Sequence, residues 1–148
     1  MQEIDQQKIN RLDGMLSEAT NIAIVTHMKP DGDALGSSIA MHSFLAMTGK
    51  KSKVILPHAQ PSNLDFLSDG STCGDIITHE QDPAAAEAAT ASADLIICLD
   101  FNAFHRTDRL EGVLKESKAA KVLIDHHLSP DTEQFDLIFS ETEVSSAS

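Results

Sequence analysis

The feature that most constrains this chain is the alternation of short apolar segments with segments of helical period. Four short runs rich in β-branched and other apolar residues predict buried strands, at Ile22–Thr26, Lys53–Leu56, Leu95–Leu99 and Lys121–Ile124. Phe135–Phe139 is a candidate for one more strand. Strands that alternate with helices form βαβ units, so the pattern predicts an α/β fold with a doubly wound, mainly parallel sheet and helices on both faces.

Helical segments fill the intervals between these strands. Ile9, Leu12, Leu16 and Ala19 recur at helical spacing, which predicts an amphipathic first helix. Further helices are expected from Ala34 to about Thr48, from Pro83 to Ala91 behind the cap residue Asp82, and from Thr107 to Ser117. The segment Pro57–Gly70 is expected to be mainly loop, with one helical turn around Asp65.

Composition excludes several classes of protein. A chain of 148 residues with 41% hydrophobic and 23% charged residues is expected to form one core. Its longest apolar run, Leu95–Leu99, is far shorter than the about 20 residues that cross a bilayer, and the polar segment Met1–Asp5 does not resemble a secretory signal, so we expect a cytoplasmic protein without a membrane partner. Cys73 and Cys98 form no Cys-x-x-Cys pair, and Cys98 is interpreted as an inert buried thiol. The net charge of −12 disfavours binding of long nucleic acids but suits metal ions.

Polar side chains follow three of the predicted strands at the point where each strand ends. The first strand is followed by His27-Met28-Lys29-Pro30-Asp31-Gly32-Asp33, the second of the three by Asp100, and the third by Asp125-His126-His127. Because the carboxyl ends of parallel strands meet at one edge of a sheet, these side chains are expected to converge there. Carboxylates gathered in this way repel one another unless they are paired or bind a metal.

The residue types favour a site for two transition-metal ions. Imidazole together with carboxylate suits manganese, iron or zinc better than calcium. Asp100 can offer one oxygen to each of two ions about 3.5–4 Å apart, the spacing used to activate water for attack on phosphorus. His126 can complete the second ligand set, and His127 is better placed for a substrate phosphate.

Each motif also has a structural interpretation. Taken alone, Asp31-Gly32-Asp33 is more typical of a turn and helix cap, and adjacent histidines are usually exposed loop residues. Arg106 is either a phosphate clamp or a solvated residue at the start of a helix, and Lys29 carries the same ambiguity. Ser37 and Ser38 are expected in the first turns of a helix, and four other histidines, His42, His58, His79 and His105, are expected to be structural or surface residues.

The three motifs together resemble those of the DHH phosphoesterase family. The segment His27 to Ser37 is similar to the first motif of that family, Asp100 with Arg106 to its second, and Asp125-His126-His127 is the motif that names it. The form Pro-Asp-Gly-Asp-Ala-x-Gly-Ser at residues 30–37 is most similar to the bacterial oligoribonucleases that also dephosphorylate phosphoadenosine phosphate.

The resemblance implies a manganese-dependent phosphohydrolase acting on short RNA oligonucleotides or small nucleotides. It assigns His27, Asp31 and Asp100 to one ion, and Asp33, Asp100 and His126 to the other. His127 then contacts phosphate, and Asp125 orients the histidine pair. The chain is also expected to be able to form a homo-oligomer.

Two elements of the family pattern have no match in residues 1–148. These are a fourth motif with another metal-binding aspartate, and a smaller substrate-binding lobe with a glycine-rich motif. Residues 1–148 are therefore expected to be an incomplete amino-terminal catalytic domain that is inactive alone, with residues 141–148 capping a helix that does not follow. Alternatives within the family are a cyclic or linear dinucleotide phosphodiesterase and a pyrophosphatase-like hydrolase. An alternative from another class is a receiver-like signalling domain that binds one magnesium ion.

Overall fold

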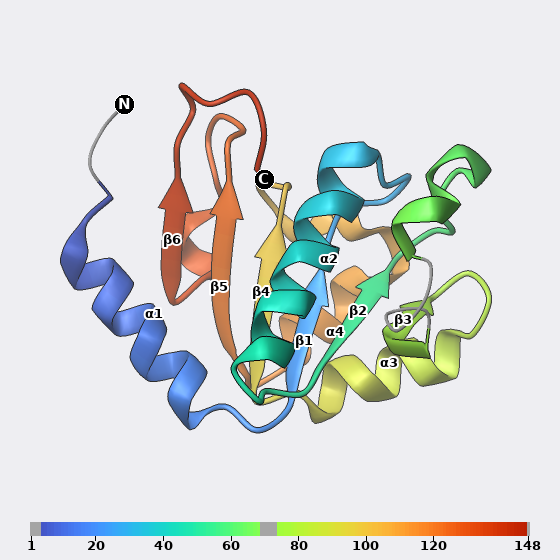
Figure 1. Ribbon diagram of the computed structural model, residues 1–148, viewed down its shortest axis with the longest axis horizontal. Coiled ribbons are helices and arrows are strands. Elements are labelled where there is room, and N and C mark those ends of the chain that lie inside the picture. Colours follow the sequence, from blue (N-terminus) through green and yellow to red (C-terminus); the bar gives the residue numbers. More distant parts are fainter. Residues whose placement is uncertain (1–3, 69–73, 148) are drawn as a thin grey trace.

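The computed structural model describes residues 4–68 and 74–147, and it contains a parallel sheet that forms the centre of the molecule (Figure 1). The expectations for Met1–Glu3, Gly70, Cys73 and Ser148 lie outside the described residues. In the described part the sheet has six strands in the order β3-β2-β1-β4-β5-β6. Their bounds are β1 Ile22–Val25, β2 Ser52–Leu56, β3 Ile76–Thr78, β4 Leu95–Leu99, β5 Ala120–Asp125 and β6 Leu137–Ser140. Each adjacent pair is parallel, which confirms the predicted α/β fold.

Helices cover both faces of this sheet. One face carries α1 (Gln6–Glu18), α2 (Gly32–Met47) and the 3-10 helix η1 (Ser62–Ser68). The other carries α3 (Pro83–Ser92), the 3-10 helix η3 (Phe104–Leu110) and α4 (Glu111–Glu116), while the short η4 (Thr132–Gln134) precedes β6. The predicted helix starts are visible in the caps, since the Asp82 carboxylate accepts a hydrogen bond from the Ala85 amide at 3.1 Å and Pro83 opens α3.

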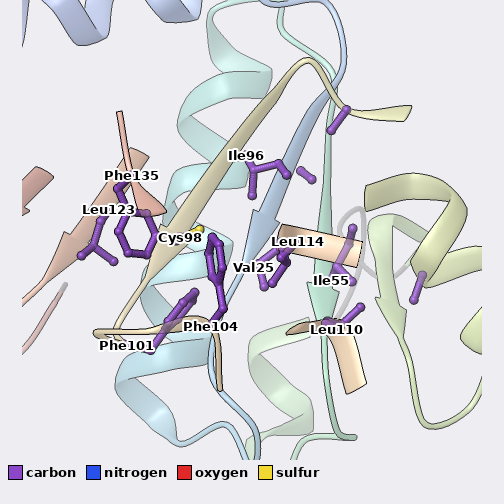
Figure 2. Packing of buried hydrophobic residues seen from close by; sticks show 13 residues of the cluster. Val25, Ile55, Ile96, Cys98, Phe101, Phe104, Leu110, Leu114, Leu123 and Phe135 are labelled. Carbon is purple, nitrogen blue, oxygen red and sulfur yellow. The ribbon is translucent and has the colours of Figure 1, made fainter. Parts of the chain in front are cut away.

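The core consists of two apolar layers, one on each face of the sheet, and successive residues of a strand contribute to them alternately. Within β4, Ile96 and Cys98 belong to the layer beneath α3 and α4, whereas Leu95, Ile97 and Leu99 belong to the layer beneath α1 and α2. Figure 2 shows the first of these layers, in which Phe104 meets Phe135 edge to face with ring centroids 5.1 Å apart. Cys98 is fully buried, and this burial raises the pKa of its thiol strongly, as expected for an inert cysteine.

Two elements differ from the sequence predictions. The edge strand β3 was not predicted, because its three residues give no measurable alternation and it forms by pairing with β2. The helix predicted from Thr107 to Ser117 is divided into η3 and α4, and Asp108 lies at the kink with φ 52°. That positive φ breaks helical hydrogen bonding at a point that residue type alone does not mark. Residues 141–147 form a turn and coil without a helix.

The strand order reverses next to the polar loops. The chain winds outward from β1 through β2 to β3, and then returns to β4 on the other side of β1 and winds through β5 to β6. In open α/β sheets ligands bind where the order reverses, outside the carboxyl ends of the strands. Here that position lies between the ends of β1 and β4. None of the described helices is both long and apolar enough to cross a membrane.

Candidate metal centre

The first loop delivers Asp31 and Asp33 to the carboxyl edge through the start of α2. The Asp31 carboxylate caps this helix by accepting a hydrogen bond from the Ala34 amide at 2.9 Å. The same oxygen, Oδ1, lies 3.8 Å from Nε2 of His27. The helix-cap interpretation of Asp31 is therefore correct, and the cap also brings this carboxylate to the histidine, since a carboxylate has lone pairs for more than one partner.

Asp100 lies at the centre of the cluster, directly after β4. Its side chain is 3% exposed, and its two carboxylate oxygens face different histidines. Oδ2 lies 3.4 Å from Nε2 of His27, and Oδ1 lies 2.9 Å from Nε2 of His126. The backbone of Asp100 has φ 64° and its amide donates to the Ile124 carbonyl at 3.1 Å, which fixes it between β4 and β5. Positive φ in a non-glycine residue is unfavourable and is commonly retained at functional sites.

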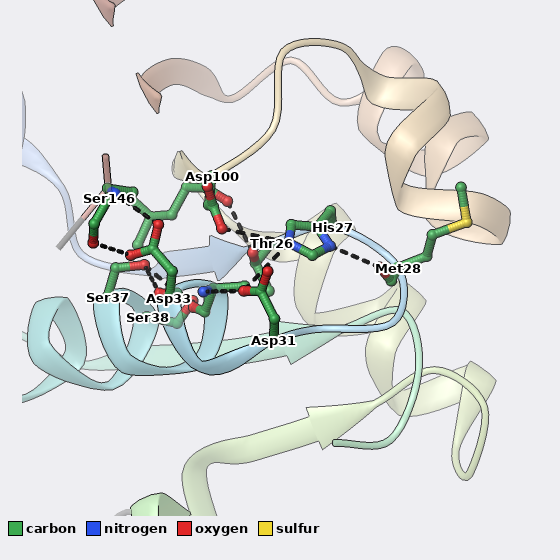
Figure 3. A network of polar contacts seen from close by, with 12 residues as sticks. Thr26, His27, Met28, Asp31, Asp33, Ser37, Ser38, Asp100 and Ser146 are labelled. Atoms are coloured by element: carbon green, nitrogen blue, oxygen red, sulfur yellow. Dashed lines mark hydrogen bonds and ion pairs between the residues drawn. The ribbon is translucent and has the colours of Figure 1, made fainter. Parts of the chain in front are cut away.

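His27 is oriented with one ring nitrogen toward the carboxylates. Its Nδ1 lies 2.7 Å from the Met28 carbonyl, so Nδ1 carries the proton and Nε2 faces Asp100 (Figure 3). The hydrogen bond to Asp100 raises the pKa of His27 above its ordinary value, while burial acts in the opposite direction. The carboxylate of Asp100 thus favours positive charge beside Nε2 of His27, and a metal cation can supply that charge. A metal-ligating histidine usually donates its other ring N–H to a carbonyl or carboxylate, as Nδ1 of His27 does to the Met28 carbonyl.

Asp33 and His126 form the opposite side of the cluster. Oδ2 of Asp33 lies 3.5 Å from Nε2 of His126, the nitrogen that also faces Asp100. Asp33 additionally accepts hydrogen bonds from the Ser146 hydroxyl and the Ala147 amide. Sequence reasoning did not identify Ser146 or Ala147, because no local pattern connects them with a residue more than a hundred positions earlier.

His127 and Asp125 form a separate pair beside Asp100. Nδ1 of His127 lies 2.6 Å from Oδ1 of Asp125 and 4.0 Å from Oδ1 of Asp100, and its side chain is 43% exposed. The carboxylate of Asp125 is buried, and its Oδ2 has no hydrogen-bond partner. Asp125 was expected to orient both histidines, and the structure gives it a hydrogen bond to His127.

The backbone of Arg106, and not its guanidinium, contacts the first loop. The Met28 amide donates to the Arg106 carbonyl at 2.7 Å, which ties the loop to η3. The Arg106 side chain is exposed and forms no ion pair with a described residue. Lys29, next to Met28, has φ 52° and is exposed. The proposed phosphate clamp therefore stays a prediction.

The other four histidines lie outside the cluster. His42 contacts Ser52 and Asp75, His58 contacts Asp108 at 2.8 Å, and His79 contacts Glu87 at 3.1 Å. His105 is exposed. Ser37 and Ser38 lie within α2, where their hydroxyls donate to helix carbonyls.

The cluster has the donor set that a transition metal needs. The potential ligand atoms form two groups, and within each group all atoms lie within 4.8 Å of one another. One group is His27, Asp31 and Asp100, and the other is Asp100, Asp125, His126 and His127. Asp100 belongs to both groups, and none of the described lysine or arginine side chains forms an ion pair with it. A buried carboxylate that faces two imidazoles, beside a second carboxylate with an unpartnered buried oxygen, is costly unless a positive charge compensates it. Nitrogen and oxygen donors together suit manganese, iron or zinc.

Comparison with known proteins identifies the family of this chain. The chain matches the N-terminal domain of the DHH family over residues 21–148. Its fold is similar to the crystal structure of an exopolyphosphatase-related protein from Bacteroides fragilis, with a TM-score of 0.92 and 36% sequence identity. The match covers 99% of this chain and 42% of the Bacteroides fragilis chain, so the chain spans less than half of that relative. The family match includes every residue of the cluster, and the chain belongs to the DHH family.

Proposed function

We propose that the full-length protein that carries this domain hydrolyses phosphate esters of very short RNA oligonucleotides, of 3'-phosphoadenosine 5'-phosphate, or of both, with two manganese ions. The observation that carries the proposal is the position of Asp100, whose two oxygens face His27 and His126 separately. Such a carboxylate is suited to bridge two ions. The DHH family is a family of phosphoesterases, which supports the same reaction class.

Each residue of the cluster has a defined role in this proposal. His27, Asp31 and Asp100 would hold one ion, and Asp33, Asp100 and His126 the other. When bound, the ions supply an activated water and neutralise charge on the phosphoryl group. His127 is half-exposed and its Nδ1 is engaged by Asp125, which leaves Nε2 for a phosphate oxygen. The exposed Arg106 guanidinium would bind a second oxygen of the substrate.

The preference for short substrates rests on charge. The chain carries a formal net charge of −12, and two divalent cations reduce it to −8, since −12 + 4 = −8. A long polyanion is repelled at that charge, whereas a substrate of a few nucleotides meets only the local field of the two ions.

A second candidate substrate class is the phosphoanhydride. The similar Bacteroides fragilis protein is described as exopolyphosphatase-related, and the same pair of ions would suit attack on the terminal phosphate of a chain of phosphates. Cyclic or linear dinucleotides are the remaining alternative. Each of these reactions uses the same cluster, so the substrate must be identified by assay.

A substrate panel tests the proposal. The full-length protein is incubated with Mn²⁺ and a dinucleotide, a five-nucleotide RNA, phosphoadenosine phosphate, pyrophosphate or polyphosphate. We expect hydrolysis of the short RNA or of phosphoadenosine phosphate, and its loss in Asp100→Asn. Asp13→Asn, a change to an exposed residue of α1, is the matched control and should keep full activity. Hydrolysis of none of these compounds by the wild type would refute a phosphoesterase function, and exclusive hydrolysis of polyphosphate would favour the second candidate.

A further inference from the structure

The segment that follows β6 returns to the start of α2. The Glu141 amide donates to the Asp125 carbonyl at 3.1 Å, and the Val144 amide donates to the Glu141 carbonyl at 3.3 Å. This turn brings Ser146 against Asp33, as Figure 3 shows. The segment Glu141–Ala147 thus extends from the end of β5, where the Asp-His-His motif begins, to the Asp-Gly-Asp motif of the first loop.

Two hydrogen bonds from this segment fix both oxygens of the Asp33 carboxylate. The Ser146 hydroxyl donates to Oδ1 at 2.6 Å, and the Ala147 amide donates to Oδ2 at 2.7 Å. Both contacts are short, as is typical when the acceptor is charged. A carboxylate has about four lone-pair sites and can accept several partners at once.

The three carboxylates proposed as metal ligands, Asp31, Asp33 and Asp100, are held in different ways. Asp31 is fixed by the helix cap, and Asp100 by burial between two histidines. Asp33 lies in the first turn of α2, where helix geometry fixes the backbone but permits several side-chain rotamers. A carboxylate with free rotamers loses conformational entropy when it binds a metal, and donors that select one rotamer in advance reduce that loss.

We propose that Ser146 is a positioning residue that holds the Asp33 carboxylate in its metal-binding orientation, with the Ala147 amide as its partner. The proposal rests on the metal-dependent function proposed above and adds a residue outside the three motifs. The Ser146 hydroxyl selects the rotamer of Asp33, and this rotamer directs Oδ2 toward His126. Hydrogen bonds that competed with a cation for the carboxylate would have the opposite sign in a binding experiment.

Calorimetric titration of the full-length protein with Mn²⁺ distinguishes these signs. We expect Ser146→Ala to weaken binding of one ion by about 10-fold, the lower end of the effect of residues that orient metal ligands, and to leave the other ion unchanged. Ser146→Thr keeps the hydroxyl and should restore the affinity. Ser145→Ala is the matched control, because Ser145 is the exposed neighbouring serine and the same atom is removed. Unchanged or tighter binding in Ser146→Ala would overturn the proposal.

Asp33→Asn separates this proposal from the proposed function. We expect Asp33→Asn to abolish binding of the same Mn²⁺ ion whose affinity is lowered in Ser146→Ala. If Asp33→Asn binds two ions with wild-type affinity, the ligand assignment itself fails. If Asp33→Asn loses one ion while Ser146→Ala binds both normally, only the role of Ser146 fails. Thermal unfolding of each metal-free variant shows whether the changes act through folding, and Ser146→Thr keeps the test valid if Ser146→Ala unfolds.

Discussion

The two edges of the sheet use aspartate in opposite ways. At the amino edge, Asp94 precedes β4 and accepts hydrogen bonds from the Thr20 amide and hydroxyl and from the Asn21 amide, at 2.8 to 2.9 Å. At the same edge, the carboxylate of Asp75 pairs with Lys53, and that of Asp136 accepts from the Lys121 amide. At the carboxyl edge, Asp100 faces two histidines and lies near other carboxylates.

This difference distinguishes a structural acid from a binding acid. Each amino-edge carboxylate meets N–H or O–H donors that the fold itself supplies, so its charge is satisfied by folding. At the other edge Asp31 and Asp33 also accept hydrogen bonds from the fold, but the buried Asp100 faces the imidazoles of His27 and His126. Oδ2 of the buried Asp125 has no hydrogen-bond partner. A bound cation would neutralise the charge of Asp100 and Asp125, and such unsatisfied polar groups are typical of functional sites.

The strongest test of this comparison replaces Asp100 with asparagine. We expect Asp100→Asn to lower Mn²⁺ affinity at both positions by more than about 100-fold, because both ions lose a shared ligand. Activity should be lost with the metals. The metal-free variant should be as stable as the wild type or more stable, because a buried charge is removed. Calorimetry and thermal unfolding measure the two effects, and two tightly bound ions in Asp100→Asn would contradict the bridging role.

The adjacent histidines provide a test within the carboxyl edge. We expect His126→Ala to lower the affinity for one Mn²⁺ ion by at least about 10-fold, because His126 faces both Asp33 and Asp100. His127→Ala should leave metal affinity near the wild-type value and reduce turnover, because His127 is bound to Asp125 and half-exposed. Calorimetry and steady-state kinetics of the full-length protein separate these outcomes. The reverse order of effects on metal affinity would refute the division of roles.

The amino edge should respond to substitution in stability alone. We expect Asp94→Asn to destabilise the protein by about 1 kcal/mol, a value reduced for the exposure of this carboxylate to solvent, because the new amide nitrogen opposes the Thr20 donors. Mn²⁺ affinity should not change. Denaturant unfolding and calorimetry test both statements, and a loss of metal binding would show that the two edges are not independent.

The smallest expected effect is the pH dependence of this Asp94 contribution. Burial acts to raise the pKa of Asp94, but the hydrogen bonds from Thr20 and Asn21 together hold it below its ordinary value of 3.8. A group whose pKa is lowered by folding stabilises the folded state above its unfolded pKa, and this contribution is lost as the pH falls through the folded pKa. The stability difference between wild type and Asp94→Asn should therefore be constant above about pH 5 and shrink below about pH 4. A difference that instead grows as the protein is acidified would contradict the proposed hydrogen bonding.

Much of the site was predictable because the topology obeys general rules. Four apolar segments were correctly predicted as strands, and parallel strands place their carboxyl ends at one edge. The convergence of His27, Asp100 and His126 follows from that rule. The cap role of Asp31 was also predictable, because a helix cap is a local property of sequence.

Features that depend on contacts between distant segments were not predictable. The edge strand β3 exists because it pairs with β2, and the kink at Asp108 divides a segment whose composition favours one helix. The sequence also does not show that Asp125 bonds to His127 or that Ser146 reaches Asp33.

The sequence by itself therefore determined the alternation of elements, the parallel sheet and the edge at which the ligand residues gather. These properties follow from hydrophobic period and the handedness of βαβ units, which act over short stretches of chain. Only the tertiary structure decided which carboxylates are satisfied and which are left facing one another. That outcome depends on donors such as Thr20 for Asp94 and Ser146 for Asp33, which are distant in sequence and meet their acceptors only when the sheet has formed.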